Sequence, residues 1–436
     1  MIQVMDLPTP AAGLQMPGRH GDRPANRPTG KGANEHRAGY HPSHDGLLSP
    51  IEEAPPAGGA VRCLHAVIVP TIRPLAEDPD EGAPLSRLPG LRLAAEIAEA
   101  RECPLVVLCS RHARAHDFPA AQVADVRAPV AVVDFPSAGP AALPGFRSDR
   151  RRISTLDRRN DVGRKRTLAL MLAAMSGWER VLFLDDDVSA LDSGRTLNPP
   201  GLDAALTALA GESPYEAVGW TLRAVDEEST DDNSVIGHAR RAAGAGQDIF
   251  IGSGALAVRC GSRTPYFPAV YNEDWLFLFD IYHRDGERRA RALAKAGSVR
   301  QRAYQPFTEQ RARSEELGDI LAEGLFSLLD LDEILDPLTE AARADHWAEV
   351  LNQRRQMMEG LKVTLPAAAV GALDAALDMH RKVTPGDFVD FIGLWRADLE
   401  KWWELQARLR RLPARELKPC FDELGLTSRT RWLGSA

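Results

Sequence analysis

The chain has 436 residues, of which 44% are hydrophobic and 26% are charged, and its formal net charge is −8 at pH 7. A soluble chain of this length and apolar content has enough material for two compact domains, or for one large domain with an appendage. The net negative charge argues against general affinity for nucleic acid, which is itself a polyanion.

Membrane and redox signals are also missing from the sequence. No run approaches the roughly 18 uninterrupted apolar residues of a membrane span, and the N-terminus lacks the pattern of a secretory signal. The five cysteines are scattered, without a C-x-x-C pair, so neither a disulfide framework nor a structural zinc site is predicted. We therefore expect a cytoplasmic protein with no integral membrane association.

Residues 1–59 differ in composition from the rest of the chain. They hold nine of the 31 prolines and nine of the 35 glycines, with almost no periodic apolar pattern. Such a segment buries too little apolar surface to offset the entropy lost on ordering. We predict a disordered tail over residues 1–59.

From residue 60, apolar β-type runs alternate with helical patterns. The expected strands lie at 63–73, 104–110, 130–135, 181–187, 216–225 and 248–259, and the expected helices lie at 91–102, 163–177 and 270–283. Strands that are apolar on both faces and separated by helices indicate an α/β fold with a mixed, mainly parallel sheet flanked by helices. Ligands of such sheets bind beyond the carboxyl ends of the strands.

From about residue 312 the pattern becomes wholly helical, and we predict an all-helical C-terminal region over 312–436. Two apolar stripes at helical spacing support it. Thr384, Pro385 and Asp387 have the pattern of a helix N-terminus. The second stripe is rich in tryptophan, and we interpret it as core packing, with an aromatic sugar platform as the alternative. Its members are Phe388, Phe391, Ile392, Trp395, Leu399 and Trp402.

Three consecutive aspartates end the apolar run VLFLDDDVS, residues 181–189. In a strand, residues i and i+2 point the same way, so Asp185 and Asp187 are expected to share a side and Asp186 to face the other. Two close carboxylates are suited to Mg²⁺ or Mn²⁺, which takes further ligands from substrate phosphates. The alternative is a turn or helix cap in which the aspartates accept backbone N–H groups.

A basic cluster precedes this strand. Between Arg147 and Arg166, nine basic residues stand against three acidic ones. Arg158, Asn160 and Arg166 lie at and just inside a predicted helix start, where side chains and helix dipole together favour a phosphate. A solvated basic loop is the alternative, and we prefer it for Arg150–Arg152.

The segment NEDW, residues 272–275, places Glu273 and Asp274 at the start of an apolar helical run. A carboxylate beside aromatic surface is suited to act as a general base on a hydroxyl. Solvated acids at a helix N-terminus are the alternative. The preceding strand FIGSGALAV supports a functional role, because Gly252 and Gly254 allow a ligand to approach the backbone closely.

Five motifs, PTIR, RRNDVGRKR, LDDDV, FIGSGALAV and NEDW, occur in an order that resembles the family-2-like nucleotide-sugar-dependent glycosyltransferases of the GT-A fold. The resemblance covers roughly residues 62–310. It implies a GT-A-like, Rossmann-like catalytic domain over 60–311. It also implies metal-dependent transfer of a sugar from a nucleoside-diphosphate sugar to an acceptor hydroxyl, the acceptor being a small molecule, a natural product or a protein.

The resemblance also implies roles for individual residues. Asp185 and Asp187 would hold Mn²⁺ or Mg²⁺, and Asp274 would be the catalytic base with Glu273 beside it. His283 is the candidate for a late metal-binding histidine, with a surface helix histidine as the alternative. Nucleotide-sugar binding would involve Pro70, Thr71, Arg73, Ser110, Arg158, Asn160, Arg166, Asp185, Asp186, Gly252 and Gly254.

The sequence departs from that family in two places. CSRHAR replaces the acidic residue that usually follows the second strand, so the nucleobase is not assigned. Near the last strand, RQRAYQPF stands where relatives show a histidine.

Three rival functions are compatible with parts of the sequence. A nucleotidyltransferase would use a similar architecture, but PTIRPLAEDPDEG lacks a glycine-rich triphosphate loop. A haloacid-dehalogenase-like phosphatase would use Asp185 as nucleophile and Asp187 as acid/base, although its nucleophile strand is expected nearer the start of the domain. A catalytically degenerate nucleotide-sugar-binding protein would bind ligand without turnover.

Overall fold

The computed structural model describes most of the chain beyond the N-terminal segment. Residues Tyr40–Ala436 group into one compact unit, and the elements below all belong to it. The described residues are 47–51, 63–73, 88–118, 120–123, 126–136, 139–140, 142–156, 161–190, 201–211, 213–224, 233–245, 250–284, 292–301, 306–329 and 336–433.

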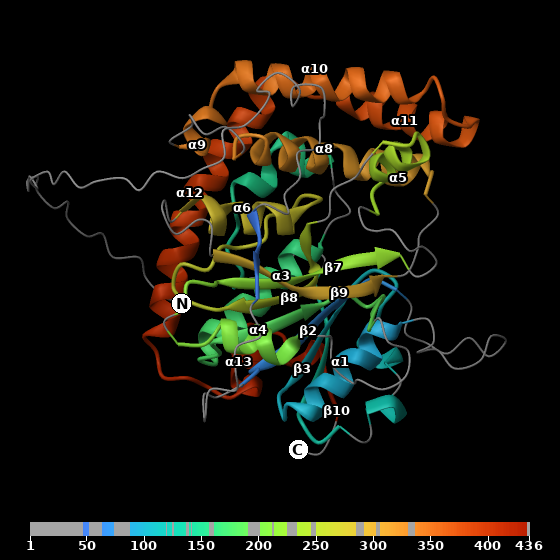
Figure 1. The fold of residues 1–436 in the computed structure, drawn as a ribbon. Helices are drawn as coiled ribbons and strands as arrows, with labels where there is room; N and C mark the ends of the chain where they lie inside the picture. Colours follow the sequence, from blue (N-terminus) through green and yellow to red (C-terminus); the bar gives the residue numbers. More distant parts are fainter. Residues whose placement is uncertain are drawn as a thin grey trace, which may run out of the picture. The chain divides into compact units, whose positions relative to one another are not determined.

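The described strands form one ten-stranded sheet in the order β1-β9-β7-β8-β5-β2-β3-β4-β10, with β6 paired to β9 (Figure 1). Neighbouring strands are parallel except where β6, β8 and β10 pair. The strands are β1 (Ser49–Pro50), β2 (Ala66–Thr71), β3 (Leu105–Cys109), β4 (Val130–Asp134), β5 (Arg180–Leu184), β6 (Val188–Ser189), β7 (Ala217–Ala224), β8 (Ile251–Arg259), β9 (Leu293–Gln301) and β10 (Thr430–Leu433).

Helices cover both faces of this sheet. The helices are α1 (Pro89–Ala100), α2 (Arg152–Leu156), α3 (Val162–Met175), α4 (Leu202–Ala208), α5 (Val235–Ala242), α6 (Glu273–Arg284), α8 (Glu309–Phe326), α9 (Pro337–Glu340), α10 (Ala344–Leu361), α11 (Ala367–His380), α12 (Pro385–Arg410) and α13 (Leu417–Glu423). Along β2, Ile68 belongs to the core cluster that includes residues of α3, α6, α8 and α12, whereas Val67 and Val69 belong to the cluster that includes residues of α1 and α4. This alternation explains why the strands are apolar on both faces, and it confirms the predicted fold class.

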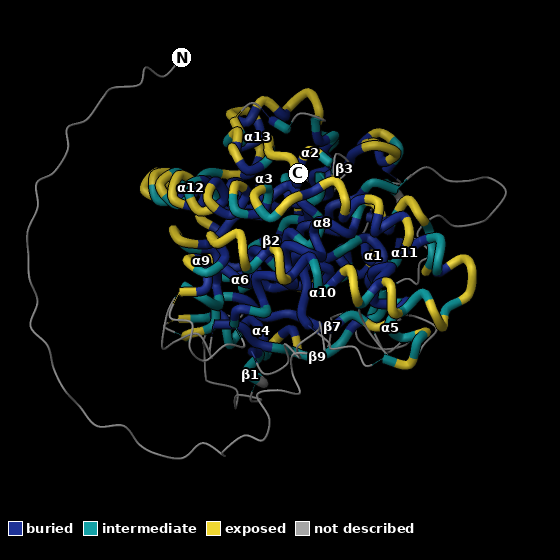
Figure 2. Tube along the Cα trace, turned by 90° about the horizontal axis from the view of Figure 1, so that it is seen from above, coloured by how far each residue is buried: buried dark blue, intermediate teal, exposed yellow. Residues whose placement is uncertain are grey.

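The helical region lies against one face of the sheet. Helix α8 packs against α6, α10 and α11, and these last two run together beside it in Figure 1. Figure 2 shows buried residues concentrated in the interior, with exposed residues along the outer sides of α12 and α13. The tryptophan-rich stripe of α12 is buried, Trp395 and Trp402 completely, so it packs in the core as interpreted.

Most predicted elements are present near their expected positions. The predicted helix N-terminus is confirmed, because Thr384 and Asp387 form a reciprocal capping box at the start of α12. Strand β9 was missed, since its sequence LAKAGSVRQ interrupts apolar residues with lysine, glycine and arginine. The C-terminal region is not all-helical: after α13 the chain returns as β10 and extends the sheet edge beside β4.

Of the disordered tail predicted over residues 1–59, the structure describes only residues 47–51. Leu47 is buried, and Ser49–Pro50 pairs with β9, so these residues are ordered where a disordered tail was predicted. The rest of that tail, 1–46 and 52–59, lies outside the described residues. The boundaries at 59/60 and 311/312 remain predictions. Within the described ranges, none of the helices combines the length and the apolar character needed to cross a membrane.

Candidate active site

A cavity of about 560 Å³ opens where β2, β3 and β5 reach their carboxyl ends. The order of the strands reverses here, because β3 and β4 follow on one side of β2 while β5 and β8 follow on the other. Such a topological switch point is where open α/β sheets bind ligands. The cavity is lined by the segment after β2, the three aspartates after β5, the start of β8, the start of α6 and one side of α8.

The loop after β2 contacts two of the three aspartates. Thr71 Oγ1 donates to Asp186 Oδ2 at 2.6 Å, and the Arg73 guanidinium contacts Asp186 Oδ1 at 3.1 Å and Asp187 Oδ2 at 2.8 Å. Burial raises the pKa of Asp186 to about 6, although Arg73 opposes that shift. The predicted alternation is therefore wrong: β5 ends at Leu184, and Asp186 and Asp187 share one cation because they lie in a turn.

Asp185 has a different partner. Arg166 Nη2 donates to Asp185 Oδ1 at 2.5 Å, and Arg166 Nη1 donates to Glu273 Oε1. Burial and the neighbouring carboxylates raise the pKa of Asp185, and Arg166 opposes this. Arg166 is 3% exposed, so it lies beneath the cavity wall and joins β5 to α6. Arg166 was predicted to contact a phosphate, but in the structure it bridges the carboxylates of Asp185 and Glu273. Glu273 therefore fixes the position of the Arg166 side chain.

Asp274 is held in a fixed orientation at the cavity. Its Oδ2 accepts from the Ser253 backbone N at 2.8 Å and from Ser253 Oγ at 3.0 Å, and its Oδ1 accepts from the Trp275 N at 2.9 Å. A Cβ on Gly252 would lie 2.9 Å from Asp274 Oδ2. Gly252 is therefore needed for the carboxylate to pack against β8, which is a different reason from the close ligand approach predicted.

The other glycine of the motif serves Asp185. A Cβ on Gly254 would lie 3.4 Å from Asp185 Oδ2 and 3.0 Å from Leu222 Cδ1, and the Gly254 carbonyl accepts from the Asp185 N at 2.9 Å. On the opposite side, Gly90 at the start of α1 donates its N–H to the Asp186 carbonyl at 3.0 Å. A Cβ on Gly90 would meet the Asp185 carbonyl oxygen at 2.0 Å. Two close backbone approaches thus fix the aspartate turn.

Lys165 was not among the predicted site residues. Its side chain is completely buried, and Nζ donates to the Thr71 carbonyl at 2.9 Å and pairs with Asp161 at 3.4 Å. Burial lowers the pKa of Lys165, and Asp161 opposes the shift. Lys165 therefore anchors the end of β2 from α3. The basic segment GRKR pointed to this helix, but only the fold shows which of its cations faces inward.

The wall contributed by α8 was also missed. Glu315, Asp319 and Glu323, at i, i+4 and i+8 on α8, all line the cavity. Behind them, the completely buried Arg354 of α10 contacts Asp319 at 2.8 Å and Glu323 at 2.7 Å, and also binds Glu316 through two hydrogen bonds. The four-residue spacing of acids was visible in the sequence, but the arginine 31 to 38 positions away was not a recognisable partner.

Asn272 connects this network to α6. It adopts a left-handed conformation with φ of 59°, and its Nδ2 donates to Asp319 Oδ1 at 2.8 Å. Asparagine tolerates this conformation better than most residues. The helical region therefore holds the residue that immediately precedes Glu273 and Asp274.

The carboxylates do not fit the predicted divalent ion in their present arrangement. Asp187 already accepts from Arg73 through Oδ2, and from Gln301 Nε2 through Oδ1 at 3.4 Å. Gln301, of RQRAYQPF, is thus the side chain beside Asp187 where the resemblance implied a histidine. Among the described residues, no three His, Cys, Asp or Glu side chains converge as a metal site.

The remaining predicted residues are distributed as follows. Pro70 lines the cavity; Ser110 is buried just behind it, with its N–H bonded to the Thr71 carbonyl. Arg158 and Asn160 lie outside the described residues. His283 Nδ1 donates to the Phe279 carbonyl at 3.0 Å, and His283 lines a different cavity at the far end of α6. About ten residues of helix, roughly 15 Å, separate it from Glu273, so its assignment as a ligand of this site is wrong.

Comparison with known proteins gives only distant structural matches. The chain is similar to glucosyl-3-phosphoglycerate synthase from Mycobacterium tuberculosis in complex with Mn²⁺, UDP-glucose and phosphoglyceric acid: 17% identity over 61% of this chain and 78% of that chain, TM-score 0.35. The same enzyme in complex with Mg²⁺ and UDP aligns at 18% identity over 61% of this chain and 78% of that chain, with a TM-score of 0.33. A mycobacterial protein aligns at 16% identity over 61% and 74%, TM-score 0.35.

No protein-family model and no curated protein matches the chain. The strand order of this chain, and not these distant matches, defines its architecture. That order and the cavity together describe an α/β protein with a cavity at the switch point of its sheet.

Proposed function

We propose that this protein transfers a sugar from a nucleoside-diphosphate sugar to an acceptor hydroxyl. The observation that carries the proposal is Asp274, a carboxylate held by three hydrogen bonds in a cavity that also contains the loops at the switch point of the sheet. A fixed base facing a nucleotide-sized cavity is the arrangement that activation of an acceptor hydroxyl requires.

The donor would lie over the end of β2. The segment Pro70–Arg73 and Arg111 after β3 flank the cavity on the nucleotide side. Arg73 there is well placed to meet a diphosphate, because a guanidinium forms paired hydrogen bonds with phosphate oxygens. A bound diphosphate would take over contacts that Arg73 now makes with Asp186 and Asp187.

In the reaction, Asp274 would remove the proton of the acceptor hydroxyl as its oxygen attacks the anomeric carbon. The bond between that carbon and the diphosphate oxygen breaks, and the nucleoside diphosphate leaves with the bonding electron pair. Arg73 stabilises the negative charge that develops on the leaving group. Arg166 and Glu273 hold the aspartate turn and α6 in register, since Arg166 bridges Asp185 and Glu273.

The predicted metal dependence is not part of this mechanism. A divalent ion at Asp187 would have to displace both Arg73 and Gln301, which now contact its two carboxylate oxygens. We infer that Arg73 supplies the cationic charge at this position.

The acceptor would approach along α8. Ser314, Asp319 and Glu323 line the cavity on that side, together with Asn272 and Trp275 at the start of α6. The side-chain oxygens of Ser314, Asp319 and Glu323 are suited to accept hydrogen bonds from the hydroxyl groups of a small polyhydroxylated acceptor.

The test uses donor binding and turnover together. A panel of nucleoside diphosphates and nucleotide sugars is screened for stabilisation of the full chain against thermal unfolding, followed by turnover assays with the donor found. Asp274→Asn should keep the donor-induced shift and lose turnover by about 10²- to 10⁴-fold. Turnover equal to wild type in Asp274→Asn would refute the base assignment, and no stabilisation by any of these ligands would refute the proposal.

A further inference from the structure

A second cavity, of about 510 Å³, lies at the opposite edge of the sheet. It is formed where β8 ends at Arg259 and α6 ends at Arg284, the ends remote from Gly252 and Asp274. Four arginines and two glutamates line it, so its charged side chains sum to +2. This excess is opposite in sign to the net charge of −8 of the whole chain.

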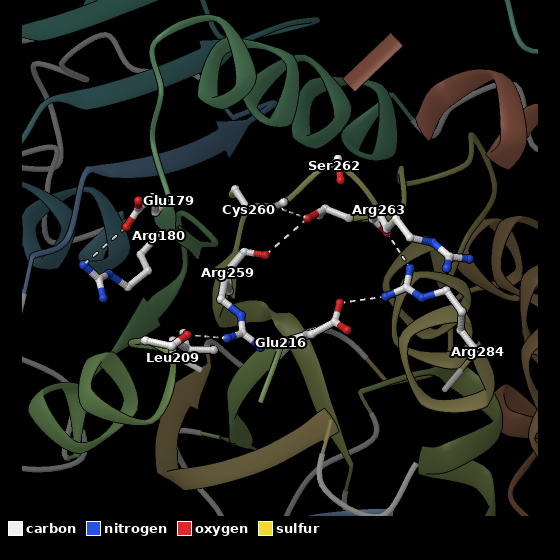
Figure 3. Close-up of a pocket in the computed structure, with 12 residues that line it drawn as sticks. Glu179, Arg180, Leu209, Glu216, Arg259, Cys260, Ser262, Arg263 and Arg284 are labelled. Atoms are coloured by element: carbon white, nitrogen blue, oxygen red, sulfur yellow. Dashed lines mark hydrogen bonds and ion pairs between the residues drawn. The ribbon is translucent and has the colours of Figure 1, made fainter. Parts of the chain in front are cut away.

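The carboxylates of this cavity are already engaged. Glu216 Oε2 pairs with Arg284 Nη2 at 2.7 Å, and Arg284 Nη1 also contacts Asp280 Oδ2 at 3.1 Å. Figure 3 shows the Glu216 carboxylate turned toward Arg284. Arg284 is therefore neutralised twice, and Glu216 has its closest cation in Arg284.

Arg259 has no such partner. Its guanidinium is half-buried and donates through Nη1 to the Gly211 carbonyl at 3.1 Å, and no carboxylate of the described residues lies within ion-pair distance. Figure 3 shows it pointing to the side of the cavity away from Arg284. Burial lowers the pKa of Arg259, with Glu216 opposing. A half-buried cation that no carboxylate contacts directly is stabilised when a ligand supplies a close counter-charge.

Arg263 adds a second guanidinium at the rim. It is exposed, stacks over the Trp403 ring at 5.0 Å from the ring centre, and forms no ion pair with a described carboxylate. Its own backbone carbonyl accepts from Arg284 Nη1, which fixes the loop that carries it. The cavity thus presents two arginines that form no ion pair with a described carboxylate, although Glu216 and Asp280 lie near enough to act on them electrostatically.

We propose that this cavity binds the phosphate group of a small molecule, held by Arg259 with Arg263 at the rim. A guanidinium donates paired hydrogen bonds that match the oxygens of a phosphate. A cavity of this volume also has room for the body of a small ligand. The site is separate from the proposed active site and does not depend on the proposed function.

The test measures binding of inorganic phosphate and pyrophosphate to the full chain by calorimetry, with thermal unfolding as a second readout. Arg259→Met should weaken binding by about 10- to 100-fold, as expected for loss of a hydrogen bond to a charged group. Arg263→Met should weaken it less. Arg92→Met, which removes an exposed arginine paired with Glu96 on α1, is the matched control and should bind as wild type.

Phosphate could also bind to Arg73 in the active-site cavity, so binding to Arg73→Met is measured in parallel. Binding that survives Arg73→Met and is lost in Arg259→Met supports the proposal. Loss in Arg73→Met with retention in Arg259→Met would overturn it, because the anion would then be in the active-site cavity. Absence of binding to the wild type at millimolar phosphate and pyrophosphate would overturn it as well. Circular dichroism checks that each variant is folded.

Discussion

The two edges of the sheet differ in how their charges are balanced. At the carboxyl edge, carboxylates outnumber arginines, and Arg73 and Arg166 each contact two of them. At the opposite edge, arginines outnumber carboxylates, and Arg259 has only a backbone carbonyl as its partner. Strand β8 and helix α6 run between the two, so each element begins beside acids and ends beside arginines.

The two edges therefore differ in the role of their arginines. Arginines that pair with buried carboxylates stabilise the fold, whereas an arginine without a carboxylate partner is available to bind a ligand. A buried ion pair contributes little net stability, but removing one member is costly because the other is left buried without a counter-charge. An arginine without a carboxylate partner leaves nothing behind when it is removed. The stability cost of removing each arginine therefore reports which kind of charge it is.

The largest expected difference is between Arg166→Met and Arg259→Met. The first leaves Asp185 and the buried Glu273 without their shared cation, and should lower the free energy of unfolding by about 3–5 kcal/mol. The second removes a cation with no carboxylate partner and should change it by less than about 1 kcal/mol. Urea denaturation measures both. If both variants lowered the free energy of unfolding equally, the two edges would not differ in how their arginines contribute to stability.

A smaller effect is expected from Gly252→Ala at the carboxyl edge. The added Cβ would lie 2.9 Å from Asp274 Oδ2, so the carboxylate must move. Turnover should fall by about 10- to 100-fold because a displacement of this kind misaligns the base, while donor binding is retained.

Gly393→Ala is the control for that substitution. A Cβ there meets no described atom within 4 Å on α12, so turnover should be unchanged and stability should rise by about 0.5–1 kcal/mol. If Gly252→Ala turns over like Gly393→Ala, the orientation of Asp274 does not matter for the reaction.

At the opposite edge, Asp280 gives a pH test of the arginine cluster. Burial raises the pKa of Asp280 to about 7, although Arg284 opposes the shift. The folded protein therefore binds a proton that the unfolded chain has already lost, and stability contributed by this group falls as pH rises from about 4 through 7. The free energy of unfolding should therefore be higher at pH 6 than at pH 8 by an amount on the order of 1 kcal/mol from this group.

Asp280→Asn should remove that part of the pH dependence of the free energy of unfolding. The exposed Asp390→Asn on α12 is the matched control and should keep the wild-type slope. An unchanged slope in Asp280→Asn would show that Asp280 has no raised pKa in the folded protein.

The smallest expected effect is that of a chelator on the wild type. With Arg73 and Gln301 at Asp187, turnover should be the same in EDTA and in Mn²⁺ or Mg²⁺. Arg73→Ala should lower turnover and make the residual activity dependent on added Mn²⁺, since the carboxylates are then open to a metal. Loss of wild-type turnover in EDTA would restore the metal dependence predicted from the sequence.

The sequence predicted the elements whose pattern is local. Alternation of apolar strands and helices gave the sheet and its covering layers, and the capping pattern gave the start of α12. The strands that end at Thr71 and Leu184 were predicted at the right place, although the predicted strands ran on to residues 73 and 187. Strand β9 was missed because it is bordered by charged residues and is recognised only through its pairing with β7.

The sequence by itself determined which residue types reach the carboxyl edge: three aspartates, a Glu-Asp pair and the arginines beside them. Only the tertiary structure decided their partners, since Arg73 and Arg166 lie 114 and 107 positions from Asp187 and Glu273. It also decided that β5 stops before Asp185 and that α6 carries His283 away from the site. The physical reason is that ion pairs and side-chain directions depend on contacts between distant segments, which periodicity along the chain does not encode.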